Sequence, residues 1–154
     1  MNRDRFVGMI LAPLLALGLL STGCGPELVP PATFGVLDSG SYDYRAATPH
    51  GVVIAARSEE NKPRATIDFW SRAVDVRLKR DGYAKTSEGA VATEHGLPGV
   101  EMRYAREKDG RAYDYVVALF VKKKRVYIVE AAGDKEDFAP AQADVEQAIR
   151  SLRE

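Results

Sequence analysis

The chain has 154 residues, with 22 basic and 22 acidic side chains, a hydrophobic fraction of 45% and one cysteine. This size suggests one folded domain, and the composition is that of an ordinary globular protein. A balanced charge gives no general attraction to nucleic acid, and one cysteine cannot form an internal disulfide, so we expect neither nucleic-acid binding nor a disulfide-stapled fold.

Residues 1–23 have the pattern of a secretory signal peptide. A short basic start precedes an apolar or small run at 6–20, which is shorter than the ~20 residues that a membrane-spanning helix needs. Small residues then lead to Cys24. This arrangement resembles the lipobox of bacterial lipoproteins, although Ser21 stands where leucine is commoner. The resemblance implies that Cys24 is acylated and becomes the mature N-terminus. The alternative is a secreted or N-terminally anchored protein with a stray cysteine.

The same resemblance implies a location in the cell envelope. Several acyl chains at ~0.8 kcal/mol per buried CH₂ would attach the protein stably to a membrane. Gly25 follows Cys24, whereas an aspartate at that position often retains lipoproteins on the inner membrane. The expected location is therefore the outer membrane, with the protein facing the periplasm.

A proline-rich segment follows the cysteine. Residues 25–33 contain three prolines and no amphipathic period, and we interpret 24–40 as an extended, semi-rigid spacer that holds the domain off the bilayer. The single folded domain is expected at 41–154.

Two strands and a helix open this domain. Residues 41–46 alternate and residues 52–56 are apolar, with turn residues between them, so a hairpin is predicted. Apolar residues then recur at helical spacing over 64–80, where Pro63 suits the first turn and Gly82 suits the cap. The helical stripe consists of Ile67, Trp70, Val74 and Leu78.

A run of strands and a second helix complete the domain. Strands are predicted at 83–86, 90–94, 100–106, 112–121 and 126–131. Short turns between the later strands favour an antiparallel meander. A helical stripe over 138–152, with Pro140 in its first turn, closes the chain. The predicted fold class is α+β, with about six antiparallel strands packed against two amphipathic helices in a two-layer sandwich.

Residues 41–153 resemble the PsbP-like fold. The resemblance rests on the tyrosine-rich first strand, the Pro49-His50-Gly51 turn, the helix ending in Asp81-Gly82-Tyr83, the long meander and the closing helix at 145–153. It implies an accessory or binding role, because proteins of this fold share an architecture and no common activity. It transfers no functional residue.

Side chains that could carry catalysis are few. His50 and His95 both lie in predicted turns, and an acid–base or metal role for His95 competes with that of a solvated turn residue. We interpret the carboxylates Asp134, Glu136 and Asp137 as neighbours of the positive end of the last helix rather than as a calcium site. No nucleotide-binding or hydrolase motif is present, so we expect no catalytic residue, metal or cofactor.

Two surfaces are candidates for partner binding. The first consists of tyrosines on the predicted strands, namely Tyr42, Tyr44, Tyr113 and Tyr115. Tyrosine is common at recognition surfaces, but tyrosines on neighbouring strands also pack against one another. The second is the basic turn, namely Lys122, Lys123, Lys124 and Arg125. Such a turn suits lipid headgroups or an acidic partner, and it also suits plain solubility.

Three functions remain open at this point. The first is a non-enzymatic envelope lipoprotein that binds a protein partner or assists assembly. The second is a carrier of a small ligand or lipid, which would need a pocket between sheet and helices. The third is an enzyme with a site around His95.

Overall fold

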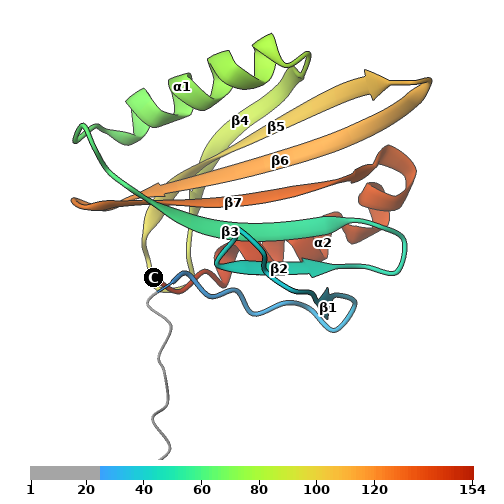
Figure 1. The fold of residues 1–154 in the computed structure, drawn as a ribbon, viewed down its shortest axis with the longest axis horizontal. Helices are drawn as coiled ribbons and strands as arrows, with labels where there is room; N and C mark the ends of the chain where they lie inside the picture. The colour runs from blue at the N-terminus through green and yellow to red at the C-terminus, as the bar shows by residue number, and fades with distance from the viewer. Residues whose placement is uncertain (1–24) are drawn as a thin grey trace, which may run out of the picture.

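The computed structural model describes residues 25–154, so the predicted signal peptide and Cys24 lie outside the described residues. One sheet and two helices form the domain (Figure 1). The elements are β1 (Gly35–Val36), β2 (Tyr44–Ala47), β3 (Val53–Glu60), α1 (Ile67–Arg80), β4 (Ala84–Ala92), β5 (Pro98–Lys108), β6 (Arg111–Val121), β7 (Arg125–Asp134) and α2 (Lys135–Arg150). Across the described part of the chain, no helix is both long and apolar enough to span a membrane.

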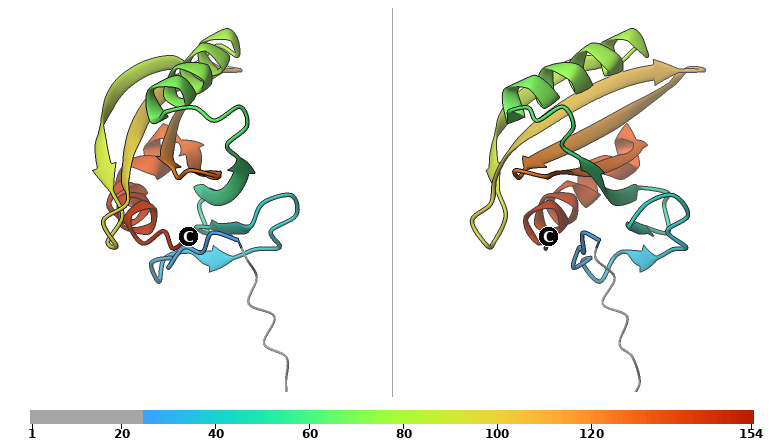
Figure 2. Two further views of the ribbon diagram at one scale, coloured as in Figure 1. Left: turned by 90° about the vertical axis from the view of Figure 1, so that its left-hand side faces the viewer. Right: turned by 60° about the vertical axis from the view of Figure 1, so that its left-hand side comes forward.

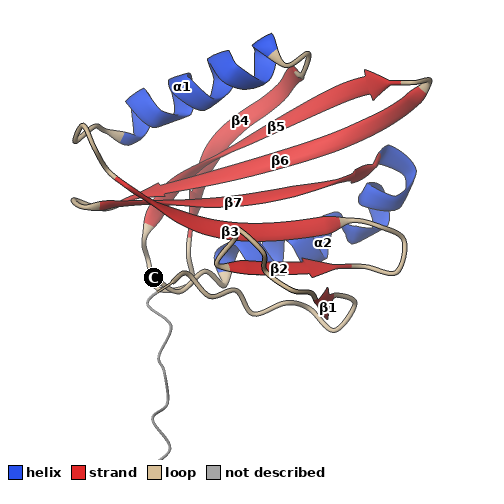
Figure 3. Cartoon of the chain, viewed as in Figure 1, coloured by secondary structure: helices blue, strands red, loops and turns tan. Residues whose placement is uncertain are grey.

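The seven strands have the order β1-β2-β3-β7-β6-β5-β4, and each neighbouring pair is antiparallel (Figure 3). The predicted meander is confirmed in β5, β6 and β7. Asp109 and Gly110 join β5 to β6 with φ values of 53° and 75°, which is the two-residue hairpin chemistry that an Asp-Gly pair favours. The helix α1 carries the chain from β3, inside the sheet, to β4 at the far edge.

Both faces of the sheet are covered (Figure 2). In β6, Val116, Ala118 and Phe120 pack in a core with α2, while Val117 and Leu119 pack on the α1 side. Successive side chains of a strand point to opposite faces, so a strand that is apolar at every position has to be buried on both.

The α+β class, the antiparallel sheet and the two amphipathic helices are therefore confirmed. The strand count is seven rather than about six. The helices lie on opposite faces, which makes three layers where we predicted two.

The segment predicted as a spacer packs on the domain. Leu28 and Phe34 are only 5% and 6% exposed and belong to the α2-side core. Glu27 forms an antiparallel bridge with Arg153, and the Val29 N–H donates to Ser151 Oγ at 2.9 Å. Part of the chain within 25–40 therefore packs on the domain, N-terminal to the boundary that we predicted at 40/41. This segment has no helical or strand periodicity, so the sequence pattern does not reveal that Leu28 and Phe34 are buried.

Several element boundaries also differ from the prediction, among them the first strand, which is 44–47 rather than 41–46, and two of the differences have a local cause. The helix α1 begins at Ile67 rather than at 64, because the Thr66 side chain caps it by accepting from the Phe69 N–H. The two weak strands predicted at 83–86 and 90–94 form one strand, β4, with a register irregularity between Lys85 and Ser87. A bulge of this kind interrupts the alternation and so imitates a break.

Candidate functional site

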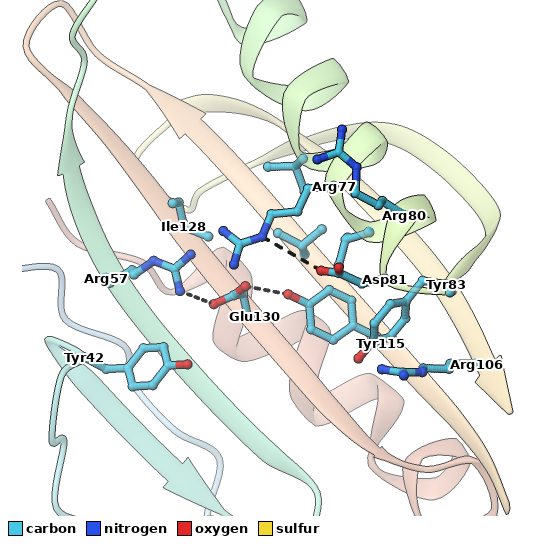
Figure 4. A pocket seen from close by; sticks show the side chains of 14 residues that line it. Tyr42, Arg57, Arg77, Arg80, Asp81, Tyr83, Arg106, Tyr115, Ile128 and Glu130 are labelled. Carbon is cyan, nitrogen blue, oxygen red and sulfur yellow. Dashed lines mark hydrogen bonds and ion pairs between the residues drawn. The ribbon is translucent and has the colours of Figure 1, made fainter. Parts of the chain in front are cut away.

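A pocket of about 780 Å³ opens on the α1 side of the sheet, beside the C-terminal half of the helix (Figure 4). The helix packs on β4, β5 and β6, and the pocket occupies the neighbouring part of the same face. Its charged lining consists of Arg57, Arg77, Arg80, Arg106, Asp81 and Glu130. Its tyrosines are Tyr42, Tyr83 and Tyr115. We call it the arginine–tyrosine pocket.

A hydrogen-bonded row across three adjacent strands forms the floor of the pocket. The Tyr115 hydroxyl, on β6, donates to Glu130 Oε1 on β7. Arg57 Nη1, on β3, donates to Glu130 Oε2 at 2.6 Å. Burial raises the pKa of Tyr115 above its ordinary value, and the charge of Glu130 raises it further, so the hydroxyl remains a donor. Both carboxylate oxygens of Glu130 are therefore engaged by the sheet itself.

Arginines stack on tyrosines on either side of this floor. The Arg57 guanidinium carbon lies 5.8 Å from the centre of the Tyr42 ring. The Arg106 guanidinium carbon lies 5.0 Å from the centre of the Tyr83 ring, and the Tyr83 and Tyr115 rings are 5.3 Å apart. Stacking orients a guanidinium group and leaves the N–H groups at its edge available.

One face of α1 supplies the rim. Four residues at positions i, i+3, i+4 and i+7 lie on the same side of this helix, namely Val74, Arg77, Leu78 and Asp81. The Arg77 side chain is 82% exposed, and its Nε lies 3.9 Å from Asp81 Oδ2. In Figure 4 Arg77 reaches over the pocket, while Arg80 points away from it. With Arg80 directed away, three arginines against two carboxylates still leave the lining with excess positive charge.

The predicted tyrosine surface divides into separate places. Tyr42 and Tyr115 line the arginine–tyrosine pocket. Tyr44 packs against the α2-side core, where its buried hydroxyl has no hydrogen-bond partner among the described residues and burial raises its pKa. Tyr113 lies further along β6, with the Arg111 guanidinium 6.0 Å from its ring centre. The four tyrosines do not form one binding surface.

The predicted basic turn lies outside the pocket. Lys122, Lys123, Lys124 and Arg125 are at the junction of β6 and β7, and all four are exposed. Lys122 forms an ion pair with Glu154, and Arg125 Nη1 lies 3.5 Å from Ser58 Oγ. The turn is thus partly neutralised and remains a separate surface.

The remaining sequence candidates lie away from the pocket as well. His95 is exposed in a turn, and His50 is exposed at a different hollow beside Ala141. Asp134 is the N-cap position of α2, with Glu136 and Asp137 in the first turn, as predicted. Within residues 25–154, no three histidine, aspartate or glutamate side chains are grouped in a way that could hold a metal ion.

Sequence reasoning missed most of the pocket, namely Arg57, Arg77, Arg106, Tyr83 and Glu130. One signal was available. Glu130 interrupts an apolar strand between Val129 and Ala131, and a charge at such a position faces a helix or a site rather than open water. The partner of Glu130 is not visible in the sequence, because β3 joins β7 only in the fold.

Neither a family model nor a curated protein sequence matches this chain. Solved structures do. One is LpqN, described as involved in cell envelope biogenesis of Mycobacterium tuberculosis, with a TM-score of 0.66, 14% identity, and 87% of this chain and 88% of that chain covered. Another is PA94, a protein of unknown function from Pseudomonas aeruginosa, with a TM-score of 0.58, 14% identity, and 83% and 84% covered.

A third is CyanoP, the cyanobacterial PsbP of Synechocystis sp. PCC 6803, with a TM-score of 0.56, 9% identity, and 84% and 86% covered. The fold is PsbP-like. At these identities a PsbP-like neighbour shows the architecture alone.

The Tyr115→Phe variant is expected to lose less stability at alkaline pH than the wild type. In the folded protein the pKa of Tyr115 lies above the ordinary value of 10.0. As the pH rises, the hydroxyl therefore loses its proton in the unfolded chain before it does so in the folded protein. The stability that the hydroxyl contributes is fully present below pH 10 and is lost as the pH rises towards the folded pKa. Thermal melts from about pH 9 to about pH 11 measure the slope. Tyr113→Phe, on the same strand outside the pocket, is the control. Parallel profiles for Tyr115→Phe and the wild type would contradict the assignment.

Proposed function

We propose that the mature protein is a non-enzymatic binding module of the cell envelope, anchored by lipid on Cys24, and that the arginine–tyrosine pocket is its binding site. The pocket is the observation that carries this proposal. Four strands and one helix hold most of its charged and aromatic groups in place. Its guanidinium and aromatic groups are of the kind that hold a ligand by charge and stacking.

The sequence and one structural neighbour support the envelope location. The signal-peptide pattern ends at a lone cysteine in a lipobox-like context. LpqN, whose fold is similar, is described as involved in cell envelope biogenesis. The chain directly after the cysteine is packed, because Glu27 and Arg153 exchange backbone hydrogen bonds of 3.0 and 2.9 Å. A lipid on Cys24 would therefore hold the domain close to the bilayer rather than at the end of a spacer.

Replacement of Cys24 by serine tests the anchor. We expect the wild-type protein in the membrane fraction, with an acylated mature N-terminus in mass spectrometry. Cys24→Ser should leave the folded domain unchanged in its melting temperature and move it out of the membrane fraction. Ser21→Leu, which brings the sequence nearer to the lipobox pattern and keeps the cysteine, is the control. A serine variant that is still acylated or still fractionates with membranes would refute the anchor.

The pocket favours a small ligand over a protein partner. Its volume of about 780 Å³ lies in the range of small-molecule sites, roughly 300–1,000 Å³. Native mass spectrometry of the protein released from envelopes by mild detergent tests this. We expect a bound small molecule on the wild type and a reduced amount on Tyr42→Ala. Equal loading of the two proteins, or no bound molecule, would count against the pocket as the binding site.

A further inference from the structure

We propose that the arginine–tyrosine pocket selects a small organic anion, and that the phosphate or carboxylate group of this ligand lies between the guanidinium groups of Arg57 and Arg77. The inference rests on the proposed function, since it names the chemistry of the ligand for the same site. It is carried by the pairing of the charges, by the direction of the two arginines and by the apolar wall beside them.

The pairing of charges leaves the Arg77 guanidinium group with unused hydrogen-bond donors. Glu130 is engaged at both oxygens, by Tyr115 and by Arg57. Arg77 meets only Asp81, at 3.9 Å, which is beyond hydrogen-bond distance. Its five N–H donors have no hydrogen-bond partner among the described residues. A guanidinium group with unused N–H donors can bind a phosphate or carboxylate through two parallel hydrogen bonds.

The direction of the side chains locates the anionic group. Figure 4 shows the Arg57 and Arg77 guanidinium groups pointing toward one another over Glu130, with the Tyr42 hydroxyl directed into the same pocket. Arg57 is fixed by its bond to Glu130 and by its stacking on Tyr42. Each arginine already has carboxylate neighbours, Glu130 and Glu59 for Arg57 and Asp81 for Arg77. Glu59 and Asp81 lie at 3.7 and 3.9 Å, beyond hydrogen-bond distance, so an oxyanion between the two guanidinium groups would meet unused N–H donors on both.

The wall beside the two arginines is apolar. Val74 and Leu78 from α1 and Ile128 from β7 line the pocket, and the Tyr83 ring lies at its other side under Arg106. An inorganic anion would leave this surface in water. A ligand with a ring or short carbon skeleton covers it while its charged group stays with the arginines.

The test uses the lipid-anchored protein in nanodiscs of zwitterionic lipid, with phenyl phosphate as the probe and calorimetry as the readout. Three comparison ligands separate the contributions. Benzoate carries a carboxylate, inorganic phosphate lacks the ring and benzyl alcohol lacks the charge. We expect phenyl phosphate and benzoate to bind, inorganic phosphate to bind about tenfold more weakly, and benzyl alcohol to show no measurable binding. Raising the salt from ~0.05 M to ~0.5 M should weaken phenyl phosphate binding.

Arg77→Gln is the decisive variant, because an exposed side chain can be replaced without threatening the fold. It should weaken phenyl phosphate binding about tenfold, or 1.4 kcal/mol, and leave the melting temperature unchanged. Arg72→Gln, on the outer side of the same helix, is the matched control and should bind like the wild type. Equal binding by Arg77→Gln and Arg72→Gln would overturn the inference, and so would benzyl alcohol binding as tightly as phenyl phosphate.

The outcomes of these experiments distinguish failure of the anion inference from failure of the proposed binding function. A small molecule that co-purifies with the wild type and not with Tyr42→Ala, together with no binding of either organic anion, would sink the anion inference and leave the binding pocket in place. The absence of both would remove the proposed function as well.

Discussion

Replacement of Asn61 by alanine is expected to lower the free energy of unfolding by about 3 kcal/mol. Asn61 is only 4% exposed and lies at the point where β3 ends. Its Oδ1 accepts from the Ala65 N–H at 3.0 Å and from Trp70 Nε1 at 2.9 Å. Its Nδ2 donates to the carbonyl oxygens of Ala65 and Lys122 at 3.2 and 3.1 Å. Alanine leaves all four partners without the hydrogen bond they have, and these bonds are partly buried, so losing them is costly.

The measurement is urea unfolding followed by the fluorescence of Trp70, which is the single tryptophan of the chain. Gln147→Ala, at an exposed position of α2, is the control and should change the unfolding free energy by less than about 0.5 kcal/mol. Asn61→Asp supplies a second comparison, because it keeps the acceptor and loses both donors, and it should also be destabilising. An alanine variant as stable as the control would show that water replaces the side chain at no cost.

The effect should extend to the arginine–tyrosine pocket. Asn61 fixes the start of α1 against the β6–β7 turn through Ala65 and Lys122. The same helix ends beside the pocket and carries Arg77 and Asp81. In the middle of the helix, Asp75 accepts from Lys79 on α1 and Tyr104 on β5. Burial raises the pKa of Asp75, but these hydrogen bonds and that of Lys85 outweigh it and hold the pKa below its ordinary value. The helix is therefore held to the sheet by polar contacts as well as apolar ones.

The parts of the fold that could be predicted are those that local physics decides. The alternation in β5 and the Asp109-Gly110 turn gave the meander, and the stripe of Ile67, Trp70, Val74 and Leu78 gave α1. The three-layer arrangement also had a local signal, since residues 116–120 of β6 are apolar without a break. A strand of that kind is buried on both faces, and the two helices are the elements available to cover them.

The parts that escaped prediction depend on contacts between distant segments. Leu28 and Phe34 lie in a segment without periodicity, and their burial is decided by α2, more than 100 positions further along the chain. The row of Tyr115, Glu130 and Arg57 requires β3 to lie beside β7, a pairing that alternation within either strand does not specify. The tyrosines were predicted without knowing which face each would take: Tyr42 lies before β2 and lines the pocket, whereas Tyr44 packs against the α2-side core.

Substitution of Gly99 by alanine is expected to cost about 3 kcal/mol of stability or more. Gly99 lies in β5 opposite Phe120 of β6. A β-carbon at this position would lie 2.5 Å from the Leu119 carbonyl oxygen and 2.5 Å from Phe120 Cδ1. The first of these atoms belongs to the backbone of β6, and the second belongs to a fully buried ring of the α2-side core. Neither atom can move away without separating β5 from β6 or opening the core.

Gly89 supplies a matched control for this prediction. It lies in the neighbouring strand β4, at the edge of the sheet, and an added β-carbon there meets no atom within 4 Å. Gly89→Ala should therefore be neutral or slightly stabilising, because alanine loses less backbone freedom on folding than glycine does. The same urea titration measures both variants. If the two alanine variants unfold at the same urea concentration, β5 and β6 do not approach each other at Gly99 as closely as the structure places them.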